Sequence, residues 1–264
     1  MPEQNENIHQ LSLKEMPRIA SLFRGWNETM ICSCLQGYMG KAYVSDSINP
    51  SAAKIDVGDF YFFAGVPNRN LVHHIPIDFS SKEILMIPQN EDWSRLIEQV
   101  WNTDSEKIKR YAIKKEQGVF DKEKLQSYID ALPQEYDIRM IDEEVYNMVM
   151  TEDWSVDLCS VFSGYRDYQR NGLGVVALHN GIPVAGASSY TVYDKGIEIE
   201  IDTRPAYRRK GLALACGARL ILECLSRGLY PSWDAHDMRS VALAEKLGYH
   251  LDKEYTAYLV KIKD

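Results

Sequence analysis

Residues 197–213 read IEIEIDTRPAYRRKGLA, and this stretch decides the predicted fold. Apolar and acidic residues alternate at its start, which predicts a strand over residues 197–201. A Pro and a basic turn follow, and Gly211 then precedes an apolar helix predicted over residues 212–227. Backbone N–H groups and positive charges would meet at the start of this helix, where a phosphate could bind. Gly211 would let a ligand approach the backbone more closely than a residue with a Cβ atom.

The composition is that of a globular protein. The chain has 264 residues, enough for one large or two small domains, and 45% of them are hydrophobic. The net charge of −8 is opposite in sign to that of most nucleic-acid-binding domains, so we expect no nucleic-acid partner. No apolar run approaches the roughly 20 residues of a membrane span, and the polar start MPEQNENIHQ lacks a signal-peptide pattern. We therefore expect no membrane association and a cytoplasmic protein.

The cysteines and histidines indicate no metal site. The five cysteines are odd in number and lack paired C-x-x-C spacing, which predicts buried free thiols in a reducing compartment: Cys32, Cys34, Cys159, Cys216 and Cys224. The pair His73 and His74 has no carboxylate or Cys at metal-ligand spacing nearby. We predict no bound metal.

The N-terminal half has the pattern of an α/β region without a catalytic constellation. Helical periodicity over residues 10–36 predicts a helix that ends near Gly37. The other predicted elements are strands at 41–45, 59–64, 83–87 and 110–114 and helices at 92–101 and 122–132. Pro133 and its polar neighbours predict a boundary, with domains at 1–134 and 135–264. The same stretch could instead be a tight connection inside one continuous sheet.

The C-terminal half has a clearer order of elements. They are strands at 138–141, 173–178, 183–191, 197–201, 230–235 and 250–260 and helical regions at 143–171, 212–227 and 240–247. A break in the first helical region is expected around Thr151 or Gly164, and Asn180 with Gly181 is typical of a tight hairpin turn. The order predicts an α/β (α+β) fold with a mixed, mostly antiparallel sheet and helices on both faces.

Two blocks of the C-terminal half resemble the signatures of the GNAT superfamily of N-acetyltransferases. Residues 203–213, TRPAYRRKGLA, resemble its acyl-CoA loop. In the family this loop has a β-branched residue, a Pro and an aromatic residue, followed by Q/R-x-x-G-x-G/A. Residues 233–249 contain WDAHDMRS and end AEKLGY, similar to the second signature, in which an Asn and a small residue precede a helix ending K-L-G-F. The resemblance covers residues 137–262. The whole chain also resembles a bacterial GNAT subfamily that includes zwittermicin A resistance proteins, which carry an extra N-terminal region.

The resemblance implies an enzyme that moves an acetyl group from acetyl-CoA, its cosubstrate, to an amine of a small molecule. The pyrophosphate and pantetheine of acetyl-CoA would lie against Ile201, Asp202, Thr203, Arg208, Arg209, Lys210, Gly211, Leu212 and Ala213. By the same match, Asp237 stands where the family has Asn, and Ser240 is its small neighbour. Asp237 lacks the amide donor, which places its contact with the cofactor arm in doubt.

Acyl transfer to an amine needs a base, because a free amine with a pKa of about 10 is protonated at neutral pH. Glu198, Glu200 and Asp202 share one face of the predicted strand, and the resemblance implies a base at Glu198 or Glu200. A solvated or helix-facing polar strip is the alternative. Ala244 stands where many GNATs have the Tyr that protonates the thiolate, so we consider Tyr249, with Tyr255 and Tyr258, as substitutes.

Other expectations concern the acceptor and the N-terminal region. The helical segment that contains Trp154, Tyr165 and Tyr168 would frame the substrate pocket. The N-terminal region would shape the acceptor side and could be a degenerate second copy of the same fold. A homodimer is considered as well. The alternative functions are an acyl-CoA-binding sensor or inactive GNAT relative, and a nucleotide binder, which the antiparallel meander before the loop disfavours.

Overall fold

The computed structural model describes residues 8–79 and 81–262, which form two compact units. Unit 1 comprises the residues up to Arg110 together with those from Tyr255 onward, and unit 2 comprises Tyr111–Glu254. The chain passes between the units within strand β6 (Ser105–Ile113) and again within strand β13 (Leu251–Lys261). Each of these two strands therefore contributes residues to both units.

Unit 2 contains a five-stranded sheet in the order β11-β10-β9-β8-β7. Its strands are β7 (Tyr136–Met140), β8 (Gly174–His179), β9 (Ile182–Tyr193), β10 (Gly196–Thr203) and β11 (Tyr230–Ser232). All neighbours are antiparallel except β10 and β11, which are parallel. This confirms the predicted mixed, mostly antiparallel sheet.

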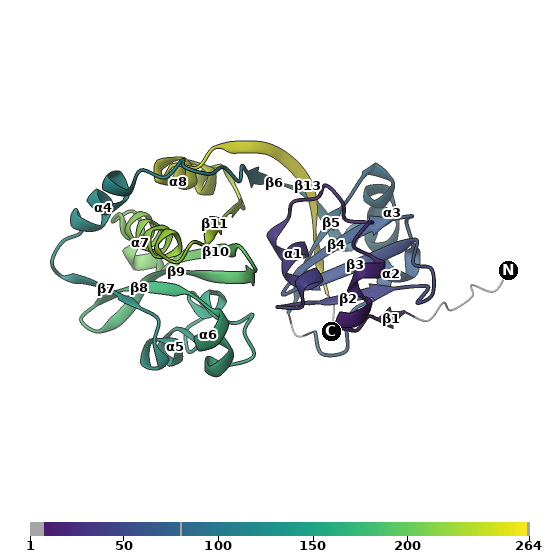
Figure 1. Cartoon of the computed structure of the whole chain (residues 1–264), viewed down its shortest axis with the longest axis horizontal. Coiled ribbons are helices and arrows are strands. Elements are labelled where there is room, and N and C mark those ends of the chain that lie inside the picture. Colours follow the sequence, from purple (N-terminus) through teal and green to yellow (C-terminus); the bar gives the residue numbers. More distant parts are fainter. Residues whose placement is uncertain (1–7, 80, 263–264) are drawn as a thin grey trace. The chain divides into compact units, whose positions relative to one another are not determined.

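Helices cover both faces of this sheet (Figure 1). Helix α7 (Leu212–Ser226) packs on one face, and α5 (Glu143–Val149), the 3-10 segment η3 (Val156–Leu158) and α6 (Tyr165–Asn171) lie on the other. The remaining elements of the unit are α4 (Lys122–Asp130), η4 (Pro205–Tyr207), β12 (Asp234–Ala235) and α8 (Met238–Leu247). Strand β12 pairs with the end of β6, so residues 230–235, predicted as one strand, form two strands with different partners.

Unit 1 contains the strands β1-β2-β3-β4-β5-β13 of an eight-stranded sheet, whose order continues through β6 and β12. Its strands are β1 (His9–Gln10), β2 (Lys41–Val44), β3 (Ala52–Val57), β4 (Phe60–Gly65) and β5 (Glu83–Pro88), with residues 258–261 of β13 paired to β5. Its helical segments are η1 (Leu13–Arg18), α1 (Thr29–Gln36), α2 (Arg69–His73), α3 (Glu91–Trp101) and η2 (Asn102–Asp104). Side chains of α2, α3 and β13 complete the core on one face of the sheet.

The two units repeat one order of elements. Each has a strand, a helical segment, an antiparallel meander of three strands, a helix, and a strand parallel to the last strand of the meander. The parallel pairs are β4 with β5 in unit 1 and β10 with β11 in unit 2. A degenerate second copy of one fold in the N-terminal half stays a prediction.

The compact units separate at positions that differ from the boundary predicted between residues 134 and 135. Residues 111–134 belong to unit 2, because α4 packs against α7 and the Glu116 N–H donates to the Tyr230 hydroxyl at 2.9 Å. The residues from Tyr255 onward belong to unit 1, because β13 pairs with β5 there. Such long-range pairings leave no local mark in the sequence.

The single helix predicted over residues 10–36 is wrong. Pro17 lies within the short 3-10 segment η1, and Gly25 has a φ of +81°, a left-handed conformation that stops a helix. Only α1 remains, and it ends as predicted at Gly37, whose φ is +79°. The helical region predicted over residues 143–171 is likewise divided, into α5, η3 and α6.

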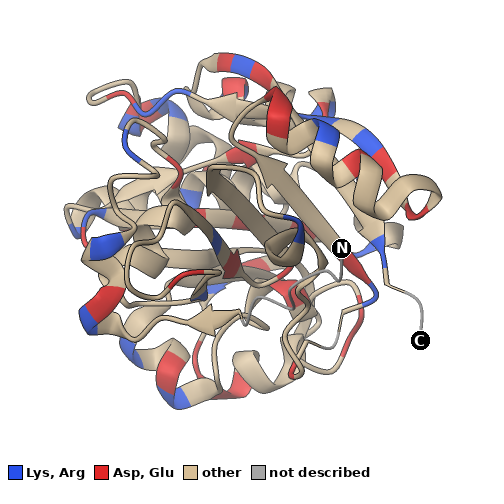
Figure 2. Cartoon of the chain, turned by 90° about the vertical axis from the view of Figure 1, so that its right-hand side faces the viewer, with Lys and Arg blue, Asp and Glu red and all other residues tan. Residues whose placement is uncertain are grey.

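The surface and cysteine chemistry are ordinary for a globular chain. All five cysteines are free thiols, and four of them are buried. Figure 2 shows basic and acidic residues interspersed along the helices and loops. Among the described residues, no helix has the length and hydropathy needed to cross a bilayer, and no cluster of three metal-ligating side chains occurs.

Strand β3 carries a buried ion pair in unit 1. The Lys54 Nζ atom lies 3.0 Å from Asp56 Oδ2, and the two side chains are 0% and 7% exposed. Lys54 also donates to the His74 carbonyl at 2.7 Å and lies 4.2 Å from the centre of the Tyr61 ring. Burial lowers the pKa of Lys54 and raises that of Asp56 to about 7. Burial, and then the Lys54 charge, lowers the pKa of His74 to about 4.

These shifts predict two opposed effects of pH on stability. Asp56 holds a proton in the folded state that it loses on unfolding, so its stabilisation is lost as pH rises from about 4 towards about 7. His74 gains a proton on unfolding, so its stabilisation is lost as pH falls from about 6.5 towards about 4. Relative to wild type, Asp56→Asn should gain stability and His74→Phe should lose stability as pH rises from 4.5 to 6.5. Each relative slope should approach ~1.4 kcal/mol per pH unit in denaturant titrations.

Asp56→Asn removes the carboxyl group that faces Lys54 and should lower stability throughout this range, so the slope of stability against pH, not its absolute value, is the test. His74→Phe leaves the ion pair in place and serves as the second variant. Wild-type slopes in both variants would contradict the assignment.

Candidate functional site

The N-terminus of α7 offers backbone N–H groups to open space. Gly211 is the N-cap, has a φ of +82°, and no side chain caps the helix there. A Cβ atom added at Gly211 would meet no atom within 4 Å, so the space in front of the helix is free. The first N–H groups of a helix have no partner within it. Those of Leu212 and Ala213 can therefore bind an anion, and the pyrophosphate of an acyl-CoA fits a cradle that only a glycine leaves open.

The loop before this helix is strained and tied to β10. Arg209 has a φ of +63°, a left-handed conformation that non-glycine residues rarely adopt and that clusters at functional sites. Arg208 donates from Nε to the Thr203 carbonyl at 3.2 Å, and its Nη2 atom lies 3.9 Å from Asp202 Oδ1. The backbone N–H of Thr203 donates to the same carboxylate. All three basic side chains are exposed, and Arg208 is the one that bonds back to β10.

Two contacts of the loop escaped the sequence analysis. The Tyr207 hydroxyl lies 3.1 Å from His179 Nδ1, which connects the loop to the end of β8. Lys210 Nζ lies 4.8 Å from the centre of the Tyr207 ring, a cation–π distance. The only signal for these contacts in the sequence was an aromatic residue, Tyr207, before the basic turn. Its partner His179 lies in a hairpin that is distant in sequence. The two contacts fix the basic turn in front of α7.

Strand β10 is paired along one side but only partly along the other. It pairs with β9 from Gly196 to Thr203, whereas its parallel pairing with β11 ends at the pair Glu198 and Ser232. Residues 199–203 of β10 therefore extend beyond the part of the strand that is paired with β11. The pantetheine arm of an acyl-CoA carries amide groups, and this edge of β10 can receive it as an added strand. Ile201, Asp202 and Thr203, predicted to bind the cofactor, lie on that edge.

The acidic row of β10 faces away from α7. Ile201 points towards α7, because its Cδ1 atom lies 3.1 Å from a Cβ atom placed on Gly217 of that helix. Alternation then places Glu198, Glu200 and Asp202 on the opposite face. Glu198 is 4% exposed, and Glu200 and Asp202 are half-buried. Burial raises the pKa of Asp202. A carboxylate that acts as a base on an amine belongs in such a partly desolvated row.

Tyr249 has the surroundings of a packing residue. Its side chain is 2% exposed, and its hydroxyl donates to the Pro231 carbonyl at 2.7 Å. Burial raises its pKa well above the usual value, so the phenol keeps its proton. The geometry therefore does not favour Tyr249 as the acid that protonates a thiolate. Ala244 is fully buried.

Asp237 and Ser240 are both engaged at the start of α8. Asp237 is the N-cap, and its Oδ1 atom accepts from the N–H groups of Arg239 at 2.9 Å and Ser240 at 3.0 Å. The Ser240 hydroxyl accepts from Trp233 Nε1 at 3.0 Å. Hydrogen bonds from the Arg239 side chain and these N–H groups lower the pKa of Asp237. Asn and Asp cap helices equally well, which explains how the carboxylate replaces the amide here.

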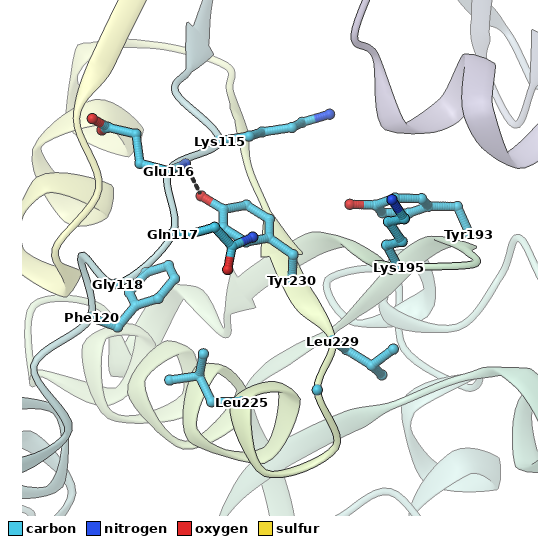
Figure 3. Close-up of a pocket in the computed structure, with 11 residues that line it drawn as sticks. Lys115, Glu116, Gln117, Gly118, Phe120, Tyr193, Lys195, Leu225, Leu229 and Tyr230 are labelled. Carbon is cyan, nitrogen blue, oxygen red and sulfur yellow. Dashed lines mark hydrogen bonds between the residues drawn. The ribbon is translucent and has the colours of Figure 1, made fainter.

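A cavity of about 420 Å³ lies at the other end of α7 (Figure 3). Leu225, Leu229 and Tyr230 line it, with Lys115 and Lys195 at its edges. The Tyr230 hydroxyl accepts from the Glu116 N–H there. The C-terminus of a helix repels phosphate, and a helix of 15 residues spans about 22 Å. This cavity is therefore too far from Gly211 to be the predicted acyl-CoA site.

A second cavity, of about 280 Å³, lies beside the loop end of β10. It is lined by Met148, Thr151, Glu152, Trp154, Ser155, Ile182 and Pro183. Glu152 accepts from Trp154 Nε1 at 3.0 Å and lies 3.3 Å from Arg204, the residue after β10. Of the aromatic residues predicted to frame the acceptor, Trp154 lines this cavity. Tyr168 is instead buried, with its hydroxyl 2.9 Å from Ser188 Oγ.

The cap geometry predicts how Asp237 tolerates substitution. Asp237→Ala should lower the free energy of unfolding by about 1 kcal/mol, because two N–H groups lose their acceptor. Asp237→Asn should change it by only a few tenths, because the amide oxygen caps as well. Denaturant titrations of both variants measure the difference. Equal losses of stability in the two variants would show that the ion pair with Arg239, not the cap, is what stabilises the helix. The Arg239 side chain is 91% exposed, so we expect this ion pair to contribute little.

Comparisons with known proteins agree with the predicted family and fold. The family described as GNAT acetyltransferase matches residues 20–258. A GCN5-related N-acetyltransferase-like protein from Streptococcus suis 89/1591 is 47% identical, and its crystal structure superposes with a TM-score of 0.88 over 94% of this chain and 99% of that one. The uncharacterized N-acetyltransferase YdfB of Bacillus subtilis (strain 168) is 25% identical over 268 residues, 95% of this chain and 98% of YdfB.

A likeness in fold alone extends to a tandem GNAT protein from the clavulanic acid biosynthesis pathway. It is 10% identical, with a TM-score of 0.58 over 98% of this chain and 99% of that one. The match spans both units, which agrees with the order of elements that they share.

Proposed function

Because this chain belongs to the GNAT acetyltransferase family, we propose that it is an N-acetyltransferase that uses acetyl-CoA and acetylates an amine of a small molecule. The uncapped N-terminus of α7 beside the open edge of β10 carries this proposal. The first feature suits the pyrophosphate and the second suits the pantetheine arm. Together they form the cradle that an acyl-CoA requires.

The residues of the loop divide the work of binding. The N–H groups of Gly211, Leu212 and Ala213 would hold the pyrophosphate, with added charge from Arg209 and Lys210. Arg208 would keep the loop against β10, since its side chain already bonds the Thr203 carbonyl. The edge of β10 at Ile201, Asp202 and Thr203 would orient the pantetheine amides.

The acidic row supplies the base. Bound acetyl-CoA would supply a thioester carbonyl for the amine to attack and a thiolate that leaves. Glu198 or Glu200 would accept the proton of the incoming ammonium group, directly or through water, so that the amine becomes a nucleophile. A backbone N–H near Ile201 would donate to the oxyanion that develops. Thiolate is a tolerable leaving group, so the absence of a Tyr at Ala244 does not prevent turnover.

Unit 1 offers no comparable cradle among its described residues. Helix α2, which corresponds to α7 in the order of elements, has five residues, and the Asn68 side chain caps it by accepting from the Leu71 N–H at 3.1 Å. We therefore assign one acyl-CoA site to the chain, in unit 2. A role for the N-terminal region in shaping the acceptor side stays a prediction.

A matched pair of glycines at the two ends of α7 tests the cofactor site. Gly211 and Gly228 have φ values of +82° and +70°, and a Cβ atom at either would meet no neighbour within 4 Å. Replacement by Ala should therefore lower stability similarly in both, by about 1 kcal/mol. Only Gly211→Ala should weaken the binding of acetyl-CoA, because the new methyl group enters the space proposed for the phosphates. Titration calorimetry should show a loss of affinity of tenfold or more. Unchanged affinity in Gly211→Ala would refute this site.

Thiol release over a panel of small amines tests the reaction itself. Release with one class of amine is expected from the wild-type chain, and Glu198→Gln and Glu200→Gln should identify the base by a loss of 100-fold or more. Binding of acetyl-CoA without release for any amine would instead indicate the sensor or inactive relative that Ala244 suggests.

Tyr249→Phe separates packing from acid catalysis. Loss of the buried hydrogen bond to Pro231 should cost about 1 kcal/mol of stability. The rate of thiol release should stay within about threefold of wild type, because the phenol faces a carbonyl rather than the open edge of β10. A fall of 100-fold would restore Tyr249 as the general acid.

A further inference from the structure

Three polar side chains form a row across the sheet of unit 2. Glu198 on β10 is paired in register with Thr191 on β9 and with Ser232 on β11. Side chains of paired residues lie on the same face, and neighbouring strands are about 4.8 Å apart. The row Thr191–Glu198–Ser232 therefore places a carboxylate between two hydroxyl groups.

This row is buried. Thr191 and Ser232 are 0% exposed and Glu198 is 4% exposed. In the described part of the chain, neither the Thr191 hydroxyl nor the Ser232 hydroxyl has a hydrogen-bond partner. A buried hydroxyl without a partner costs about 1–3 kcal/mol, so two of them beside one carboxylate indicate a small polar ligand.

The row also lies where the sheet opens. Glu198 and Ser232 are the last pair between β10 and β11, and residues 199–203 of β10 extend beyond it. The register of β10 against β9 shifts between Glu198 and Ile199, and bulges of this kind often adjoin active sites. The row is thus at the inner end of the edge assigned to the pantetheine arm.

We propose that Thr191 and Ser232 each hold a water molecule against Glu198, and that these waters carry the proton from the acceptor amine to the carboxylate. A buried water makes about three hydrogen bonds, so each can bond one hydroxyl, the carboxylate and one further polar group. Thr191 and Ser232 are then positioning residues, and Glu198 rather than Glu200 is the base. This inference rests on the proposed N-acetyltransferase function.

The proton balance is simple. The ammonium group gives a proton to one of these waters, which passes one of its own to Glu198, leaving a neutral amine and a neutral carboxyl group. The amine nitrogen then bonds to the thioester carbon, the C–S bond breaks, and the sulfur leaves with its electron pair. The thiolate and the second amine proton, with the proton held on Glu198, yield the free thiol, the amide and one proton released to solvent.

Several titratable groups lie near the row. Glu200 and Asp202 share its face of β10, and Asp157 on η3 is close enough to raise the pKa of Asp202. The phenols on the neighbouring elements are Tyr168, Tyr230 and Tyr249. Burial is the main cause that raises the pKa of each phenol, and the Glu198 charge adds to it for Tyr230 and Tyr249. The phenols therefore stay neutral at neutral pH and below.

Two variants of the full chain test the row. Thr191→Val and Ser232→Ala each remove one hydroxyl with little change in shape. Each should lower kcat/KM by tenfold or more and move its acidic limb upward by about one pH unit, with acetyl-CoA affinity unchanged. Ser189→Ala is the control, because Ser189 lies on the opposite face of β9 and its hydroxyl accepts from the Leu173 N–H at 3.0 Å. The control should lose stability and keep the wild-type pH profile.

A measurement without substrate separates this inference from the proposed function. Carbon-13 labelling of the Glu carboxyls, with Glu198→Gln for assignment, reports the Glu198 pKa by NMR. That pKa should rise in Thr191→Val and Ser232→Ala, because the charged carboxylate loses a hydrogen-bonded water. A rise in a chain that binds no acetyl-CoA would keep the water site and reject the transferase. The water site would be overturned if the enzyme is active and both variants are more stable than wild type, with the wild-type Glu198 pKa and the wild-type pH profile of kcat/KM.

Discussion

The unequal pairing of β10 determines what unit 2 can do. One side of the strand is bonded to β9 over its whole length, so the strand is rigid. The other side is bonded to β11 only as far as Glu198, so its later residues extend past the partner strand. A rigid strand with an open edge is a template for an extended ligand. The loop 204–211 leads from this edge to Gly211 and the start of α7. The N–H groups proposed to hold the pyrophosphate therefore follow the open edge in the chain.

The two units show how the same order of elements can gain or lose such a cradle. In unit 2 a glycine and a long helix follow the last strand of the meander, and the N–H groups stay available. In unit 1 the helix has five residues, and the Asn68 side chain accepts from its Leu71 N–H. The buried charged groups of unit 1 lie elsewhere, in the ion pair of Lys54 and Asp56 on β3. Such pairs are expensive to bury, and they favour one arrangement of the core over others.

The sequence predicted the elements whose signals are local. Alternation predicted β10, and Gly211 with the apolar run predicted α7. Strand β3 was missed because Lys54 and Asp56 interrupt the apolar pattern of AAKIDV, although both side chains are buried. Residues 230–235 were predicted as one strand because their switch of partner from β10 to β6 depends on distant residues. The hydroxyls of Thr191 and Ser232 gave no signal, since both residue types are ordinary in strands and only the register brings them to Glu198.

The place of β13 has a consequence for synthesis. The residues that complete the edge of β5 belong to β13, so they are synthesised only after all of Tyr111–Glu254. Until then, the first half of the nascent chain carries a strand with unbonded N–H and C=O groups along one side, which is a template for aggregation. Domains usually fold as they emerge, N-terminal first. Here the first half cannot complete its sheet until unit 2 has been synthesised, so the edge of β5 stays open during that time.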